Sequence, residues 1–359
     1  MTTSTDFLVS RKDLHETKFV ETPLVLKQGQ ALIKVDRFAF TANNVTYGAF
    51  GDMMMYWNFF PGPEGWGRVP VWGFGDVVES QAEGVKSGER YYGYFPMSTH
   101  VVMEPTRLSP EGFLDGAAHR QKMAPVYNRY QNTSTYPSYD RAREAQHALL
   151  RPLFTTSFLI DDALAENDFF GAREVLISSA SSKTSLGLAY LLHANRRGQV
   201  AVVGLTSKSN SSFVEKTGYY DRVVTYDAIP QSPRDRTAAY IDMAGNGELR
   251  LAVHKHWADQ LKYSSAVGAT HWDHAAQITD MPGPRPQMFF APDRVKKRNQ
   301  DWGPGGLDKH LATAWTAFNG SVDGWMKVVE GRGRADVERI YHAMLDGKAK
   351  PEEGHMLSL

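Results

Sequence analysis

The hydrophobic and polar positions follow two different patterns along the chain. From about residue 5 to residue 105, short runs of alternating apolar and polar side chains are separated by Gly and Pro, as at 31–35 (ALIKV) and 75–79 (GDVVE). A period of two is typical of half-buried strands. This part of the sequence therefore predicts a β-barrel-like domain.

After Pro152, strand-like runs alternate with helix-like runs. The expected strands lie at 174–179, 200–205, 222–225, 238–242 and 262–267. The helices expected between them lie at 186–194, 211–216 and 247–257. Strands joined by crossover helices indicate a parallel sheet, and a dinucleotide-binding sheet is the leading interpretation.

The remaining segments are less regular. Residues 106–150 are polar and rich in Tyr, and predict a long connection followed by a helix at about 138–149. Beyond about residue 281 the regularity fades, until a helix near 335–345 and a last strand at 355–359. A chain of 359 residues exceeds one typical hydrophobic core. We expect a catalytic domain of residues 1–150, rejoined by 285–359, and a dinucleotide-binding domain of residues 151–284.

The first strand of the second pattern leads directly into a helix through a turn of small and hydroxyl-bearing residues. Such a turn presents backbone N–H groups to a pyrophosphate. Against the G-x-G-x-x-G pattern, the glycine positions fall at Ser182, Thr184 and Gly187, so only the last is kept. A Cβ at Thr184 pushes the backbone away from a phosphate, but the hydroxyls and the Lys183 ammonium can hold an anion. An ordinary strand-to-helix turn is the alternative.

The following strand ends where the adenosine ribose of a dinucleotide would lie. An NAD site carries Asp or Glu there, whereas this chain has Thr206, Ser207 and Lys208. Neutral donors and a cation suit the 2′-phosphate of NADP. Residues 207–210 (SKSN) are also a good loop and helix N-cap sequence. The spacing of this position from the preceding turn favours a cofactor site and predicts NADP(H).

Composition and charge narrow the chemistry. The chain has no cysteine, which excludes thiolate catalysis and Cys-ligated zinc. His254 and His256 would point to different faces of a helix, so no metal site is expected. Forty basic and forty acidic residues balance, so nucleic acid is not an expected partner. The sequence begins without the pattern of a secretory signal and has no membrane-length apolar stretch, so a cytoplasmic location without membrane association is expected.

The whole chain resembles the medium-chain dehydrogenase/reductase superfamily, closest in style to its zinc-independent quinone and enoyl reductases. The resemblance rests on 31–35, 41–44 (TANN), Gly48 and 84–90 (GVKSGER) in the first half, and on 222–226, 241–245 and 263–268 in the second. It implies an α/β fold with a GroES-like β-barrel catalytic domain and a Rossmann-type doubly wound parallel sheet. It also implies cofactor contacts at Tyr226 and at Gly268, whose strand end would face the nicotinamide.

Further segments, at 127–130, 151–158, 269–273 and 289–293, resemble a bacterial branch of this superfamily for which the resemblance implies no particular reaction. The resemblance to the superfamily also implies a homodimer. No residue of this sequence by itself indicates one.

The resemblance also suggests where substrate chemistry lies. Asn44 and Tyr47 sit where zinc-free relatives place polar groups near the nicotinamide, so either could donate to a substrate carbonyl. The alternative is that Asn44 stabilises a turn and Tyr47 packs in the barrel. His271 follows the strand ending at Gly268 and could relay a proton with Asp273 orienting it, although a histidine in such a place is more often structural.

Aromatic residues give a further candidate surface. Tyr127 and Tyr130, in the long connection, either close over the site or only pack. The aromatic segment 56–72 is either a substrate wall or a hydrophobic contact between domains or subunits.

We therefore expect a zinc-independent NADP(H)-dependent reductase of an enone or enoyl, quinone or carbonyl group on an apolar or aromatic small molecule. The alternative is a non-redox lyase or isomerase, or a ligand-binding protein, that retains the fold with a degraded cofactor turn.

Overall fold

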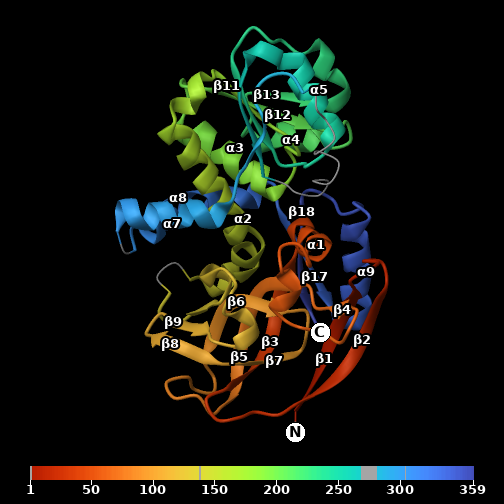
Figure 1. The fold of residues 1–359 in the computed structure, drawn as a ribbon, viewed down its shortest axis with the longest axis vertical. Helices are drawn as coiled ribbons and strands as arrows, with labels where there is room; N and C mark the ends of the chain where they lie inside the picture. Colours follow the sequence, from red (N-terminus) through yellow and green to blue (C-terminus); the bar gives the residue numbers. More distant parts are fainter. Residues whose placement is uncertain (1, 137–138, 268–280, 304) are drawn as a thin grey trace. The chain divides into compact units, whose positions relative to one another are not determined.

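The computed structural model describes residues 2–136, 139–267, 281–303 and 305–359 (Figure 1). The chain forms two compact units, the first made of Met1–Leu149 with Lys327–Leu359 and the second of Leu150–Met326. The division falls within helix α2 (Glu144–Glu166). Residues 285–326, which the sequence predicted to join the first unit, belong to the second.

The second unit is built on a six-stranded parallel sheet with the order β13-β12-β11-β14-β15-β16. In chain order this is 3-2-1-4-5-6, the arrangement of dinucleotide-binding sheets. The strands are β11 (Glu174–Ile177), β12 (Ala201–Thr206), β13 (Arg222–Thr225), β14 (Ala238–Asp242), β15 (Leu261–Ala266) and β16 (Gln287–Met288). The five strands predicted from sequence are all present, and β16 adds a sixth at the edge.

Among the described residues, three helices connect these strands: α3 (Lys183–Asn195), α4 (Ser211–Thr217) and α5 (Gly247–Trp257). The strands of this sheet carry apolar side chains, which the helices cover. Leu176, Val203 and Tyr240 pack with Val253 and Trp257 of α5 in one buried cluster. Short 3-10 turns complete the unit at η5 (Asp168–Gly171), η6 (Tyr226–Gln231), η7 (Ala258–Gln260) and η8 (Val322–Gly324).

Helix α2 corrects one expectation. The helix predicted to end at residue 149 begins after a 3-10 turn, η4 (Arg141–Arg143), and continues through Pro152 to Glu166. Proline cannot donate the backbone hydrogen bond of a helix interior. Here the burial of Phe154, Leu159 and Leu164, each almost fully buried, outweighs that loss.

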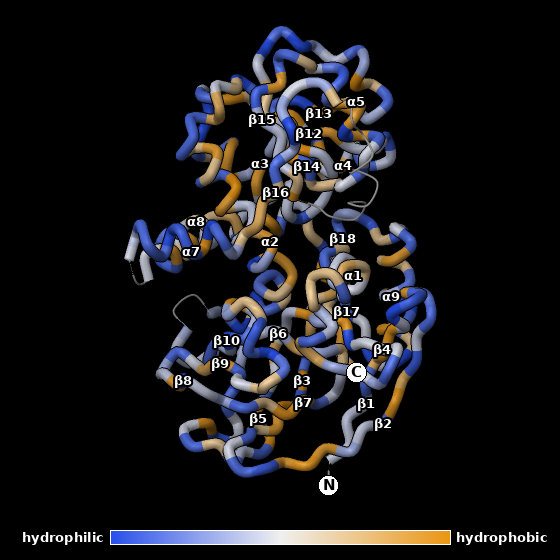
Figure 2. Tube along the Cα trace, in the orientation of Figure 1, coloured by the Kyte–Doolittle hydropathy of each residue, from blue (hydrophilic) through white to orange (hydrophobic). Residues whose placement is uncertain are grey.

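Two further helices, α7 (Ala291–Trp302) and α8 (Gly306–Ser321), lie side by side where the sequence predicted irregular structure (Figure 1). Figure 2 colours α7 mainly hydrophilic and α3 largely hydrophobic. Because α7 has few apolar positions, periodicity could not identify it. Ion pairs hold it instead: Arg294 and Arg298 both contact the Asp162 carboxylate of α2, at 2.7 and 2.6 Å.

The first unit contains two sheets, of order β2-β1-β4 and β17-β18-β3-β5-β6-β10-β9-β8, with β7 also paired to β3. Its strands are β1 (Thr2–Ser10), β2 (Thr17–Leu24), β3 (Ala31–Phe40), β4 (Trp66–Gly67), β5 (Pro70–Ser80), β6 (Arg90–Pro96), β7 (His100–Met103), β8 (Pro105–Ser109), β9 (Gly112–Asp115), β10 (Arg129–Asn132), β17 (Lys327–Arg332) and β18 (Glu353–Ser358). These described strands do not close into a barrel, so the predicted GroES-like barrel is not confirmed.

The tail joins the first unit through β17 and β18, and helix α9 (Gly333–Leu345) packs beside them. β18 runs antiparallel to β3, and β17 runs parallel to β18. The first unit also has helix α1 (Ala42–Ala49) and 3-10 turns η1 (Tyr56–Asn58), η2 (Ala118–Arg120) and η3 (Pro125–Tyr127). Within the described residues, no helix has both the length and the apolar composition needed to cross a bilayer.

Candidate functional site

The turn between β11 and α3 lies at the carboxyl edge of the parallel sheet, next to the place where the strand order reverses. Four consecutive residues there, Ser181, Ser182, Lys183 and Thr184, are partly exposed. Ser182 is the N-cap of α3, and its Oγ accepts a hydrogen bond from the backbone N–H of Ser185 at 3.2 Å. Among the described residues, the backbone N–H groups of Ser181 and Thr184 have no acceptor. The turn therefore offers donors to an anion.

Tyrosines hold this glycine-poor turn from the β13 side. The Tyr226 hydroxyl accepts a hydrogen bond from the backbone N–H of Ser179 at 3.2 Å, and the Tyr220 hydroxyl donates to the Ala180 carbonyl at 2.8 Å. Ser179 adopts a left-handed backbone conformation with φ of 46°. Burial raises the pKa of the Tyr226 phenol, which keeps its proton. Tyr226, predicted as a cofactor contact, thus supports the turn directly.

Gly187 permits a close approach of helices. A Cβ built at this position would lie 2.8 Å from Ser157 Oγ and 3.3 Å from a Phe154 ring carbon, both on α2. The Ser157 hydroxyl also donates to the Thr184 carbonyl at 2.7 Å. The sequence predicted close packing of the helix on its strand, but the contact that requires glycine is with α2.

The loop after β12 carries the predicted ribose-end residues. Lys208 is exposed, and Ser207 is partly exposed with its Oγ 2.9 Å from Ser209 Oγ. Asn210 occupies the N-cap position of α4 (Ser211–Thr217) but makes no side-chain cap hydrogen bond, and its side-chain amide donates to Ser181 Oγ at 3.0 Å. This bond joins the loop to the β11–α3 turn. The structure therefore brings the two predicted halves of the cofactor site together through a residue that sequence reasoning had not selected.

A buried polar network fixes the neighbouring carboxyl end of β14. The Ser178 hydroxyl donates to the Asp242 carboxylate at 3.0 Å and accepts from the backbone N–H of Met243 at 2.9 Å. Arg250 Nε donates to the same carboxylate at 2.7 Å. Asp242 is fully buried, so this pairing offsets the cost of burying its charge. The network ties β11 to β14 at the edge that carries the turn.

Two predicted residues of this unit, Gly268 and His271, together with Asp273, lie outside the described residues. The strand that precedes them, β15, is described to its end, where the Val267 N–H donates to the Asp242 carbonyl at 2.9 Å.

In the first unit, both the oxygen and the nitrogen of the Asn44 side-chain amide are hydrogen-bonded to nearby protein groups. Its Oδ1 accepts from the Thr41 N–H at 2.8 Å and from the Thr41 hydroxyl at 3.1 Å, and its Nδ2 donates to the Pro70 carbonyl at 2.9 Å. These bonds cap the start of α1. The geometry thus favours the alternative interpretation, in which Asn44 has a structural role.

Tyr47, one turn further along α1, belongs to an aromatic group that we call the tyrosine cluster: Tyr47, Tyr56, Tyr94 and Tyr127. The Tyr47 ring lies 4.5 Å from that of Tyr56 and 5.7 Å from that of Tyr94, and the Tyr94 and Tyr127 rings lie 5.0 Å apart. Trp72, whose ring centre lies 5.0 Å from that of Tyr94, adds a further aromatic surface. Segment 56–72 and the 127–130 connection thus meet in one place.

Burial raises the pKa of all four phenols, and the neighbouring Tyr56 adds to the effect on Tyr47. The cluster consequently presents protonated hydroxyl groups over a wide pH range. Tyr47 and Tyr94 are buried, whereas Tyr56 and Tyr127 are partly exposed. Tyr56 begins the aromatic segment 56–72 that the sequence indicated as a candidate substrate wall, whereas Tyr94 was not selected from sequence.

Tyr130, for which closing over a site and packing were both left open, is fully buried, which favours packing. It packs in the core of the first unit and its hydroxyl accepts from Arg120 Nη1 at 2.8 Å. Among the described residues, no group of three or more His, Asp or Glu side chains is arranged to hold a metal ion.

Comparison with known proteins gives a family and a fold. Residues 38–350 match the family model described as "Protein of unknown function (DUF2855)". The structure is similar to that of CurA from Vibrio vulnificus in complex with NADPH, with a TM-score of 0.61 at 11% identity over 99% of this chain and 98% of that one. It is also similar to the quinone oxidoreductase from Coxiella burnetii, with a TM-score of 0.58 at 13% identity over 100% of both chains.

A mutant form of enoyl thioester reductase from Candida tropicalis is similar over 100% of both chains, with a TM-score of 0.57 at 8% identity. The search of curated proteins gave no match. At these identities the likeness concerns the fold, and it confirms the predicted resemblance to the fold of quinone and enoyl reductases.

Proposed function

The chain belongs to the family described as protein of unknown function (DUF2855), and we propose that it is an NADP(H)-dependent oxidoreductase. One observation carries the proposal: the β11–α3 turn has backbone N–H groups without acceptors among the described residues, and Asn210 joins it to the loop bearing Lys208. A pyrophosphate held at the start of α3 would place its adenosine end toward that loop. The NADPH complex of CurA, which is structurally similar, supports the same assignment.

The residues available at this site fit the phosphorylated coenzyme better than NAD. Ser182, Lys183 and Thr184 supply hydroxyl, ammonium and backbone donors for the pyrophosphate, and Ser207 with Lys208 suits a 2′-phosphate. The exposed Lys208 ammonium is the group that separates NADPH from NADH, because NADH has a neutral hydroxyl in place of the 2′-phosphate. Bound NADPH supplies the hydride.

For the substrate, we propose an enone or enoyl, quinone or carbonyl group on a fairly apolar small molecule. The reaction would be zinc-independent. The tyrosine cluster supports this class, since its aromatic rings suit a flat apolar compound and its protonated phenols can donate to a carbonyl oxygen that gains charge. Tyr56 is the preferred donor because it is partly exposed, and Tyr47 lies behind it, where its hydroxyl accepts from Asn43 Nδ2 at 2.7 Å.

The coenzyme assignment is tested by titrating the full chain with NADPH and with NADH, following the nicotinamide fluorescence. NADPH is expected to bind in the micromolar range and NADH much more weakly. Lys208→Ala should weaken NADPH binding by about tenfold, which is the loss of one charge-assisted contact, and should change NADH binding little. Lys216→Ala is the matched control, because Lys216 is exposed on the neighbouring helix α4 and lies outside the site.

The substrate assignment is tested by NADPH oxidation with a panel of quinones and enones. If Tyr56 donates to the substrate, Tyr56→Phe should lower kcat by about a hundredfold at unchanged NADPH affinity, a magnitude typical of a lost oxyanion donor. Tyr91→Phe provides the control, since the Tyr91 hydroxyl donates to Glu89 at 2.8 Å and lies outside the cluster.

The competing function is a non-redox lyase or isomerase, or a ligand-binding protein, on the same fold. The specific observation behind it is that the Tyr226 hydroxyl already takes the Ser179 N–H in a turn that lacks two of the three expected glycines. Failure of NADPH and NADH alike to bind would favour this function over the reductase.

A further inference from the structure

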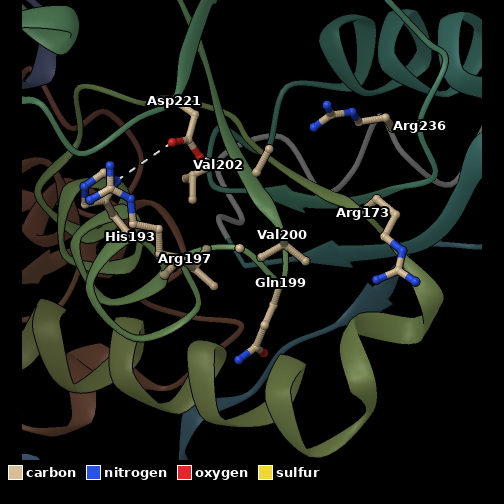
Figure 3. Close-up of a pocket in the computed structure, with 11 residues that line it drawn as sticks. Arg173, His193, Arg197, Gln199, Val200, Val202, Asp221 and Arg236 are labelled. Carbon is tan, nitrogen blue, oxygen red and sulfur yellow. Dashed lines mark hydrogen bonds and ion pairs between the residues drawn. The ribbon is translucent and has the colours of Figure 1, made fainter.

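A cavity of about 500 Å³ opens in the second unit at the amino ends of the strands (Figure 3). Its walls come from the residues that precede β11, β12, β13 and β14, and from the end of α3. The volume lies within the range of small-molecule sites. No part of the proposed coenzyme site lines it.

The cavity lies at the opposite edge of the sheet from the β11–α3 turn. The Arg173 N–H donates to the Thr237 carbonyl at 2.7 Å, and the Arg173 carbonyl accepts from the Ala201 N–H at 2.9 Å. Arg173 therefore sits where the amino ends of three neighbouring strands meet. The whole length of β11 separates it from Ser178, so a ligand bound here would not touch the pyrophosphate position.

Three arginine side chains line this cavity: Arg173, Arg197 and Arg236. All three are exposed, and none forms a side-chain hydrogen bond or an ion pair among the described residues. Arg236 acts on the Glu174 carboxyl through its charge alone: burial raises the pKa of that carboxyl, and the charges of Arg222 and Arg236 lower it. Adjacent arginines behave differently, since Arg196 pairs with Asp161 at 3.0 Å and Arg222 pairs with Glu174 at 3.0 Å. The lining arginines thus differ from Arg196 and Arg222 in forming no ion pair among the described residues.

The acidic lining group, Asp221, does not neutralise these arginines. Its Oδ2 accepts from the Val202 N–H at 2.7 Å, and its Oδ1 lies 3.9 Å from His193 Nδ1 (Figure 3). Arg197 follows the end of α3, where a cation also stabilises the helix dipole. Arg173 and Arg236 follow no α-helix directly, so that explanation does not apply to them.

The floor of the cavity is apolar. Leu192, Val200 and Val202 line it and are buried. An apolar floor beneath unpaired guanidinium groups suits a molecule that carries an anionic group on an apolar body. Guanidinium binds phosphate oxygens in two parallel hydrogen bonds, which favours phosphate over a monovalent anion.

We propose that this cavity binds a small organic phosphate, with the phosphate on Arg173 and Arg236 and the apolar part over Val200 and Val202. Arg197 would close the remaining side. This site is independent of the coenzyme site, and its ligand is a second molecule.

Calorimetric titration of the full chain with phenyl phosphate and with inorganic phosphate, at low ionic strength, tests the proposal. Phenyl phosphate should bind more tightly than inorganic phosphate, because only the former covers the apolar floor. The double variant Arg173→Gln/Arg236→Gln should weaken phenyl phosphate binding by at least about tenfold. The control, Arg107→Gln/Arg141→Gln, removes the same charge from exposed positions of the first unit and should change the affinity less than about twofold.

Three results would overturn the proposal: absence of phenyl phosphate binding, equal loss in both double variants, or equal affinity for the two probes. Lys208→Ala separates this site from the coenzyme site. Phenyl phosphate binding should survive that substitution, and its loss there would place the anion at the Lys208 loop after β12 instead. Failure of NADPH to bind would leave the result at this cavity unaffected.

Discussion

Asn210 and Ser181 join two loops that are 29 residues apart in the chain, through a hydrogen bond of 3.0 Å from the amide to the hydroxyl. Their strands, β11 and β12, are parallel neighbours, so both loops emerge at the same edge of the sheet. The bond restrains the loop that carries Lys208 relative to the turn that carries Thr184. A coenzyme that contacts both loops would meet them already ordered, which lowers the entropic cost of binding.

Asn210→Ala is accordingly expected to weaken NADPH binding by about fivefold, which corresponds to one neutral hydrogen bond. Fluorescence titration measures the effect. Asn195→Ala, at the exposed end of α3, should leave the affinity unchanged. An unchanged affinity in Asn210→Ala would mean that the link between the loops has no part in coenzyme binding.

The sequence predicted the strands and helices of the second unit closely because short apolar runs alternate there with helical patterns. Strands β13 and β14 and helix α5 occupy the predicted residues. The residue that joins the two halves of the site was not predicted. Asn210 has a typical N-cap sequence, and only the tertiary neighbour Ser181 redirects its side chain.

Gly187 provides a test of the α2–α3 contact. Gly187→Ala places a methyl group 2.8 Å from Ser157 Oγ, and overpacking of this kind lowers the free energy of unfolding by about 1–3 kcal/mol. Chemical denaturation measures the loss. Because the nearest atom belongs to Ser157, the substitution should cost less in a Ser157→Ala background.

Gly320→Ala is the matched control, since this glycine also lies in a helix and a Cβ there meets nothing within 4 Å among the described residues. It should be neutral or stabilise the protein by about 0.5–1 kcal/mol. Equal effects at the two glycines would contradict the close-packing explanation.

Arg120 is expected to position the tyrosine cluster. The guanidinium is fully buried and donates to Asp115 at 2.7 Å, to Tyr130 at 2.8 Å and to the Tyr127 carbonyl at 2.7 Å. Arg120→Ala leaves the Asp115 carboxylate buried without its partner and should destabilise the first unit by about 3–5 kcal/mol. Arg129→Ala, which breaks the exposed pair with Glu111, should cost less than about 1 kcal/mol.

A spectroscopic measurement distinguishes a role of Arg120 in positioning the tyrosine cluster from a general contribution to stability. Because Arg120 holds the Tyr127 backbone, Arg120→Lys should retain a folded protein while changing the near-ultraviolet circular dichroism of the aromatic residues. An unaltered aromatic signal in a folded Arg120→Lys protein would separate Arg120 from the cluster.

At Asn44 and at α7 the structure differs from the sequence prediction for the same reason. In both places, polar side chains form specific tertiary or capping contacts whose partners are not periodic in sequence. The Asn44 amide bonds to Pro70, 26 residues away, and α7 is held by the carboxylates of α2, more than a hundred residues earlier. Hydrophobic periodicity cannot detect either contact. Asn44 was therefore predicted as a candidate catalytic group, and the residues of α7 were predicted as irregular structure.

Protonation of Glu166 at acid pH should weaken the attachment of α7 to α2. Hydrogen bonds from Lys297 and Arg294 lower the pKa of the Glu166 carboxyl from its usual 4.5 to about 2. Between these values the unfolded chain binds a proton that the folded chain does not, so falling pH favours unfolding. The stabilisation by Glu166 is complete above pH 4.5 and is lost as the pH falls through about 2. Urea denaturation of the native protein and of Glu166→Gln, at several pH values across this window, measures it.

The native protein should be more stable than Glu166→Gln above pH 4.5, and the difference should shrink toward zero as the pH approaches 2. Glu64→Gln controls for the loss of a carboxylate, because Glu64 is exposed and forms no ion pair among the described residues. The free energies of unfolding of Glu64→Gln and of the native protein should differ little, and this difference should not change with pH. A difference for Glu166→Gln that stays constant down to pH 2 would show that the ion pairs with α7 contribute no pH-dependent stability, and packing alone would then hold the helix in place.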